Sequence, residues 1–274
     1  MGVCVLSLNF TYNSKRGGVF APDYQIVPYP SPIMRRQALQ DIMKHIGIMG
    51  KGTKYIEIGY GSGIFTYEFY HMGFDVYGYE LSESAYETAN KIFNTDKQRL
   101  NLKHKLTDED NEAYDLLGAY EVLEHCEDDA GVLREWSKLL RKGGYLLLSV
   151  PARMKNFGLR DKWAGHIRRY EKAELVTLLQ AQGFELIELI SYGFPLPKLM
   201  EWAIKILVDK PHLKRLDNLN SDTAHKTSVS GIEREEEFRF NRVFPYRLFV
   251  IFGKIQRLFY NTDLGIGYVV VVRK

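Results

Sequence analysis

Three glycines at alternating positions are the first feature of this sequence that could do chemistry. The run Tyr55-Ile56-Glu57-Ile58-Gly59-Tyr60-Gly61-Ser62-Gly63 joins a strand-like stretch to a segment with helical spacing. Glycine lets the backbone adopt positive φ and lets a ligand approach the main chain, and the first turn of a helix offers free N–H groups. Such loops bind a cofactor at the carboxyl end of a strand. Gly59, Gly61 and Gly63 are therefore candidate cofactor-binding residues.

Glu80 is a second candidate for the same site. It directly follows the next predicted strand, at 74–79. An acidic residue about 20 positions beyond the first glycine can accept both hydroxyls of a ribose. A dinucleotide fingerprint, G-x-G-x-x-G, would place its third glycine where this sequence has Ile64. The spacing therefore argues against a nicotinamide cofactor.

Short strands that alternate with helices have to position these residues. The pattern predicts strands at 55–58, 74–79, 100–106, 114–119, 145–150, 184–190 and 266–272, and helices at 64–70, 84–93, 129–140 and 172–182. Ser84 and Glu87 have the spacing of a capping box, and 141–144 ends the third helix with basic residues and glycines. This alternation indicates an α/β fold with a doubly wound, mostly parallel sheet.

The G-x-G-x-G spacing, with Glu57 in the strand before it, resembles motif I of the class I S-adenosylmethionine-dependent methyltransferases. The segment 114–125, which ends in Glu121-Val122-Leu123-Glu124-His125, resembles their fourth-strand motif. The segment 139–146 resembles their L-(K/R)-P-G-G turn, with Lys142 where proline is usual. The resemblance covers about 53–192 and the last strand. It points to the branch of ubiquinone-type and bacterial small-molecule O-methyltransferases.

The resemblance implies a Rossmann-like fold whose seven-stranded sheet has an antiparallel last strand. It also implies S-adenosyl-L-methionine as the cofactor, with S-adenosyl-L-homocysteine as the product. Its site residues would be Gly59, Gly61 and Gly63 around the methionine and ribose parts, Glu57 nearby, Glu80 on the ribose, Asp108 facing the adenine amine and Glu121 by the methionine end. Asp108 begins a run of three acidic residues, which allows three registers.

A hydroxyl acceptor must also lose a proton, for which histidine is the usual residue. His166 is the first candidate, because it follows the fifth strand and lies in a stretch similar to the G-H-x-R-x-Y of related sequences. By that resemblance Arg169 and Tyr170 would line the acceptor pocket. An equally weighted alternative is that Arg168, Arg169 and His166 only anchor the loop through carboxylate pairs. His125 is the second candidate base.

A metal ion is the less favoured interpretation of the acidic motif after the fourth strand. Glu121, Glu124 and His125 are spaced i, i+3 and i+4, so one helical turn could bring them to one cation. Some relatives use such an E-x-x-E-H arrangement for a divalent metal. The sequence identifies no fourth ligand, so we expect no metal.

Two flanking segments are expected to enclose the acceptor. Residues 1–50 form an N-terminal arm, with Tyr24 and Tyr29 as candidate substrate residues, and a helix at 33–46. Residues 195–262 form a helical cap, with helices at 198–208 and 246–260 and a mobile polar loop at 217–237, inserted into a cofactor-binding domain of 51–194 and 263–274.

The end of the cap, 238–260, carries eight aromatic residues, five basic residues and no acidic one. We expect its apolar face to pack over the active site with its cations solvated. Peripheral contact with a membrane or a lipid-linked acceptor is the alternative.

Composition limits the remaining classes of protein. The chain has 274 residues, 45% of them hydrophobic, and a net charge of +3, which excludes collagen-like, disordered and disulfide-scaffold proteins and favours no nucleic-acid partner. Two cysteines, no recognisable signal peptide and no membrane-length apolar run indicate a cytoplasmic protein. The best interpretation is O-methylation of a small-molecule, natural-product or sugar acceptor. A non-catalytic, cofactor-binding regulatory subunit and a nicotinamide oxidoreductase are the rivals, and the oligomeric state stays open.

Overall fold

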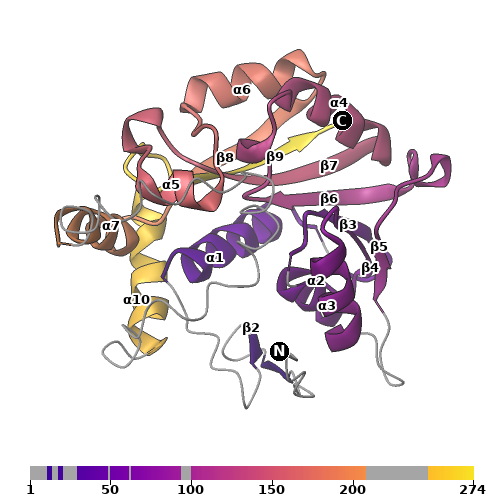
Figure 1. Ribbon diagram of the computed structural model, residues 1–274, viewed down its shortest axis with the longest axis horizontal. Coiled ribbons are helices and arrows are strands. Elements are labelled where there is room, and N and C mark those ends of the chain that lie inside the picture. The colour runs from indigo at the N-terminus through magenta and orange to yellow at the C-terminus, as the bar shows by residue number, and fades with distance from the viewer. Residues whose placement is uncertain are drawn as a thin grey trace.

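A seven-stranded sheet forms the centre of the molecule (Figure 1). The computed structural model describes residues 11–13, 18–20, 30–48, 50–61, 63–93, 100–207 and 246–274. The sheet has the order β5-β4-β3-β6-β7-β9-β8, and all neighbours pair in parallel except β9, which is antiparallel to both β7 and β8. The strands are β3 (Lys54–Ile58), β4 (Asp75–Tyr79), β5 (Asn101–Lys103), β6 (Tyr114–Tyr120), β7 (Leu140–Pro151), β8 (Glu185–Tyr192) and β9 (Gly267–Arg273). The predicted fold class is confirmed.

Helices cover both faces of the sheet, so its central strands are apolar on both sides. Leu117 and Leu148 face α4 (Asp129–Leu139) and α6 (Lys172–Ala181) in one core cluster. Their neighbours Leu116 and Leu147 face α1 (Pro30–His45) and α2 (Ile64–His71) in the other, as strand alternation requires. Figure 1 shows α4 and α6 above the sheet and α1 and α2 below it. Helix α1 is therefore part of the same core.

The remaining elements are short or lie outside these two layers. They are the hairpin strands β1 (Thr11–Asn13) and β2 (Gly18–Phe20), the helices α3 (Glu83–Phe93), α5 (Leu159–Ala164), α7 (Leu196–Leu207) and α10 (Tyr246–Gln256), and the 3-10 turns η1 (Asp108–Asp110), η2 (Leu123–His125), η3 (Met154–Asn156) and η5 (Arg257–Phe259). The strand pair β1–β2, helix α5 and the turns η1 and η3 were not predicted from the sequence, whereas η5 lies within the helix predicted at 246–260.

The structure corrects one local prediction and refines another. The start of α3 is held by Ser82, whose hydroxyl accepts from Ala85 N (3.3 Å) and whose carbonyl accepts from Tyr86 N, so the capping residue lies two positions before Ser84. The segment 141–144 does follow the end of α4, and Gly143 has a φ of +76°, but the segment lies within β7, which begins at Leu140. The pairing register of β6 and β7 shifts between Leu140 and Tyr145, so the two glycines lie in an irregular part of the strand.

The cap helix α10 packs chiefly against α1. A side chain at Gly253 would overlap Gln37 of α1, so glycine permits the close approach. Arg257 forms two bonds of 2.7 Å with Asp41, which compensates one of the five cations expected to be solvated. The loop at 217–237, Tyr24 and Tyr29 lie outside the described residues. None of the described helices is long and apolar enough to cross a membrane.

Candidate active site

The three glycines form a tight loop between β3 and α2, and all three have positive φ: +68° at Gly59, +52° at Gly61 and +74° at Gly63. Gly63 is the N-cap of α2. At Gly59 a Cβ atom would come within 2.7 Å of Val122 Cγ2, so a side chain would be strained there in two ways. The loop lies where the strand order reverses between β3 and β6, which is where open α/β sheets bind ligands.

Glu80 lies beside this loop at the end of β4. Its Oε2 accepts from Gly61 N (2.8 Å), and its Oε1 accepts from Ser82 N (3.0 Å). The structure thus brings the predicted ribose carboxylate and the glycine loop together. It also distinguishes the three registers of the acidic run. Asp110 is buried and bonded to Tyr114 and Thr107, whereas Asp108 and Glu109 are exposed and could face a ligand.

Glu57 points into the protein and not toward the loop. Glu57 is 3% exposed, and its carboxyl group accepts from the Thr66 hydroxyl of α2 (2.7 Å). Burial raises the pKa of Glu57 to about 8, although the bonds from Thr66 and Tyr55 oppose the shift. Glu57 is therefore buried behind the loop, and its place near the cofactor stays a prediction.

This burial predicts a pH effect on stability. Between the ordinary carboxyl pKa and about 8, the folded chain keeps a proton on Glu57 that the unfolded chain releases, so the free energy of unfolding falls as pH rises through that window. Glu57→Gln is neutral at every pH and keeps an acceptor for Thr66. Between pH 6 and 9, the free energy of unfolding of Glu57→Gln should therefore fall less than that of the wild type. The difference should be on the order of a few kcal/mol, measured by thermal unfolding at each pH. Exposed Glu185→Gln is the control, and identical profiles for Glu57→Gln and wild type would contradict the assignment.

Glu121 follows β6 with a φ of +58°, which is unusual for a residue with a side chain. Its Oε1 lies 3.3 Å from Arg35 Nη1 of α1 and accepts from the hydroxyls of Ser149 (3.1 Å) and Tyr192 (3.3 Å). Burial acts to raise the pKa of Glu121, but the charge of Arg35 and these bonds outweigh it and hold the pKa below its ordinary value. The group is thus an anion at neutral pH.

Glu124 lies one turn further and is fully buried. Neither of its carboxyl oxygens has a hydrogen-bond partner among the described residues. Burial and the neighbouring charge of Glu121 raise the pKa of Glu124 well above its ordinary value. A buried carboxyl group without a hydrogen-bond partner is either protonated or stabilised by a bound cation.

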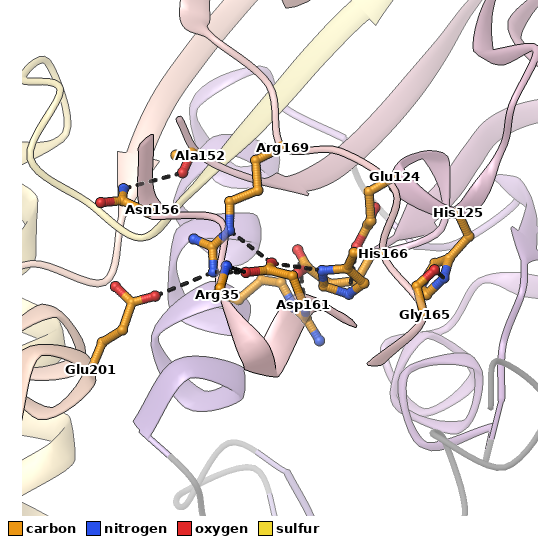
Figure 2. A network of polar contacts seen from close by, with 12 residues as sticks. Arg35, Glu124, His125, Ala152, Asn156, Asp161, Gly165, His166, Arg169 and Glu201 are labelled. Atoms are coloured by element: carbon orange, nitrogen blue, oxygen red, sulfur yellow. Dashed lines mark hydrogen bonds and ion pairs between the residues drawn. The ribbon is translucent and has the colours of Figure 1, made fainter. Parts of the chain in front are cut away.

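His166 lies 3.6 Å, Nε2 to Oε1, from Glu124 and is held from its other side (Figure 2). Its Nδ1 lies 3.0 Å from Asp161 Oδ1, and its backbone N donates to the Asp161 carbonyl (2.8 Å). Asp161 also accepts two bonds from Arg169. Burial opposes ionisation of Asp161, but the bonds from His166 and Arg169 lower its pKa. This ionised carboxylate fixes the imidazole ring.

His125 lies beside His166, with ring centroids 4.9 Å apart. Its Nδ1 lies 3.1 Å from the Gly165 carbonyl oxygen. Glu124, His125 and His166 each offer one ligand atom, and these atoms lie within 4.8 Å of one another. The structure therefore places His166 beside Glu124 and His125, as a candidate further metal ligand that the sequence did not identify. Glu121 is not in this group and is paired with Arg35.

For Arg168, Arg169 and Tyr170, but not for His166, the contacts support the anchoring alternative more than a pocket lining. Tyr170 is fully buried, and its hydroxyl donates to Asp129 Oδ2 (2.9 Å), so its predicted place in the acceptor pocket is wrong. Arg168 pairs with Asp129 (2.6 Å), and Arg169 is 9% exposed and engaged by carboxylates. Arg35 and Asp161 were not predicted from the sequence, because no local pattern distinguishes them from other helix residues.

The fold and this site define a class, the S-adenosyl-L-methionine-dependent methyltransferases of class I. A family model described as a methyltransferase domain matches residues 33–189, which is more than half of the chain. The chain belongs to this methyltransferase family.

Curated relatives are similar over part of their length. The ubiquinone biosynthesis O-methyltransferase of Pelagibacter ubique is 27% identical over 129 residues, which cover 44% of this chain and 53% of that protein. The protein of the same name from Azorhizobium caulinodans is 27% identical over 170 residues, 56% of this chain and 67% of the relative. The chain thus spans about half the length of the first of these relatives.

A solved structure shows the same fold. An S-adenosylmethionine-dependent methyltransferase from Mesorhizobium loti superposes with a TM-score of 0.54 at 14% identity, and the match covers 90% of this chain and 100% of the other.

Proposed function

We propose that this chain transfers the methyl group of S-adenosyl-L-methionine to a hydroxyl oxygen of a small-molecule acceptor of the natural-product or sugar class. The observation that carries the proposal is the Asp161–His166 pair, whose imidazole lies 3.6 Å from Glu124 in the motif that follows β6. The names of the curated relatives, O-methyltransferases of ubiquinone biosynthesis, support oxygen as the acceptor atom.

The chemistry needs alignment and one proton acceptor. As the acceptor oxygen bonds to the methyl carbon, the bond from that carbon to the sulfonium sulfur breaks and S-adenosyl-L-homocysteine forms. The hydroxyl proton passes to His166 Nε2, because Nδ1 is engaged with Asp161. The Asp161 carboxylate then stabilises the imidazolium. We expect Glu121 to lie at the methionine end, where its anionic carboxylate would receive the cofactor's ammonium group.

A labelling experiment tests the proposal. Purified chain is incubated with S-adenosyl-L-methionine carrying a ¹³C methyl group and with a cell extract, which is then separated by size and examined by mass spectrometry and NMR. We expect label only in the small-molecule fraction, at the chemical shift of an O-methyl carbon. Label on nitrogen, carbon or macromolecules would contradict the proposed acceptor. Cofactor binding without any labelled product would favour the regulatory-subunit alternative.

A divalent metal ion is a second candidate for the same site. The buried, unpartnered oxygens of Glu124 fit a cation, and one carboxylate with two imidazoles is a donor set for zinc or manganese. Asp161 and the Gly165 carbonyl hold the Nδ1 atoms of His166 and His125, as outer partners of metal-binding histidines do. Glu124, His125 and His166 would hold the ion, which when bound would lower the pKa of an acceptor hydroxyl.

Metal titration decides between these candidates. After treatment with a chelator, Zn²⁺ and Mn²⁺ are added in competition with a chromophoric chelator. If the site is a metal site, Glu124→Gln should weaken binding by about 100-fold, because it removes a ligand charge. Exposed Glu127→Gln, on the same loop, is the control and should bind as the wild type does. No binding by the wild type would leave His166 with the proton-acceptor role alone.

We also propose a cytoplasmic setting. It is supported by the low cysteine content and by the free thiol of Cys126.

A further inference from the structure

A line of polar contacts connects the cap helix α7 to His166 (Figure 2). Glu201 of α7 lies with its Oε1 3.3 Å from Arg169 Nη2, and Arg169 holds Asp161, which holds His166. We propose that Glu201 is a positioning residue for His166, acting through Arg169 and Asp161. This inference rests on the proposed function, in which His166 takes the acceptor proton.

Arg169 is the first step of the connection. Its Nε donates to Asp161 Oδ1 (2.7 Å) and its Nη2 to Asp161 Oδ2 (2.9 Å). The Nη2 atom has two hydrogens, so Asp161 receives one and Glu201 can receive the other. The guanidinium side chain is only 8% exposed, so water offers little replacement. Two carboxylates thus fix the plane of the Arg169 fork, and Glu201 supplies one of them.

Asp161 is the second step. Its Oδ1 is shared between Arg169 Nε and His166 Nδ1, and its Oδ2 accepts from Gly158 N (2.8 Å) as well as from Arg169. The Asp161 side chain is 1% exposed. A tilt of the Arg169 fork would therefore change how Oδ1 meets His166. The bond at Nδ1 determines which ring nitrogen carries the proton, and so whether Nε2 is available as the base.

Through these contacts, the position of α7 can affect the orientation of His166. Helix α7 follows β8 and contacts α1, while Leu199 and Trp202 on its outer side are 57% and 63% exposed. Glu201 therefore joins a peripheral helix to the loop that carries His166. Lys198 also reaches Glu201, with 2.8 Å between Nζ and Oε2, but it does not contact Arg169 in the described contacts. Docking of the cap helix and orientation of the base are thus coupled through one side chain.

Kinetics and NMR of three variants test the proposal, in chelator-containing buffer. Glu201→Ala should lower kcat about tenfold while the KM for S-adenosyl-L-methionine changes by less than about twofold. Long-range ¹H–¹⁵N spectra should show the His166 ring, assigned by its loss in His166→Gln, as the Nδ1–H tautomer in the wild type and as a mixture in Glu201→Ala. Glu201→Gln keeps an acceptor oxygen and should recover part of both. Lys198→Met, which removes the other partner of Glu201, should match the wild type.

Two results would overturn the proposal. One is a His166 spectrum in Glu201→Ala that is identical to that of the wild type. The other is a higher KM for the acceptor with unchanged kcat, which would mean that α7 only shapes the pocket. If no acceptor is methylated by any variant, the proposed function fails, whereas the ¹⁵N spectra still decide whether Glu201 positions the ring.

Discussion

His166→Ala should lower kcat by about 10²-fold to 10⁴-fold, because the acceptor hydroxyl loses the group that takes its proton. The affinity for S-adenosyl-L-methionine should stay within about threefold of the wild type, since the glycine loop and Glu80 are built on β3 and β4 and do not contact His166 in the described contacts. Steady-state kinetics and calorimetric titration of the cofactor measure the two quantities separately.

The control for this variant is His45→Ala. His45 is 75% exposed at the end of α1 and pairs with Glu188, so the same chemical change is made away from the site. It should leave kcat unchanged. Turnover in His166→Ala at the wild-type rate would remove His166 as the base and would turn attention to His125.

Gly61→Asp should weaken cofactor binding by at least about 100-fold, or roughly 2.7 kcal/mol. A Cβ atom at Gly61 meets nothing within 4 Å, so the variant should fold, and aspartate is among the residues that tolerate positive φ. The new carboxylate would stand beside Glu80 in the space that the ribose needs, and would repel that carboxylate. Calorimetric titration with S-adenosyl-L-homocysteine measures the loss.

Gly52→Asp is the matched control for this substitution. Gly52 has a φ of +80°, has open space around its Cα and is exposed in a turn before β3. It therefore carries the same backbone strain and the same added charge without the ligand. Binding by Gly61→Asp at wild-type affinity would show that the glycine loop has been assigned wrongly.

Local sequence patterns were sufficient to predict the fold, the glycine loop and the position of Glu80. The alternation of Leu116 and Leu117 between two covered faces follows from the period of a strand, and the positive φ of Gly59, Gly61 and Gly63 follows from a loop that only glycine tolerates well. Glu80 was predictable for the same reason. Strand β4 ends at a fixed distance from the loop, and parallel strands end at the same edge of the sheet.

Contacts between distant segments were not predictable from such patterns. Glu124 and His166 are 42 positions apart, and Asp161 and Arg169 approach only because the chain turns at Gly165. The burial of Glu57 and Tyr170 depends on which helices cover the sheet, and no spacing reports that. The same holds for α10, whose apolar stripe predicted a helix but did not identify α1 as the surface it packs on.

Parallel titrations of the wild-type chain with S-adenosyl-L-methionine and with NAD⁺ test the central assignment most directly. The geometry of the glycine loop and Glu80 predicts saturable binding of S-adenosyl-L-methionine at one site per chain, displaced by S-adenosyl-L-homocysteine, and no heat with NAD⁺. Saturable binding of NAD⁺ together with no binding of S-adenosyl-L-methionine would contradict it.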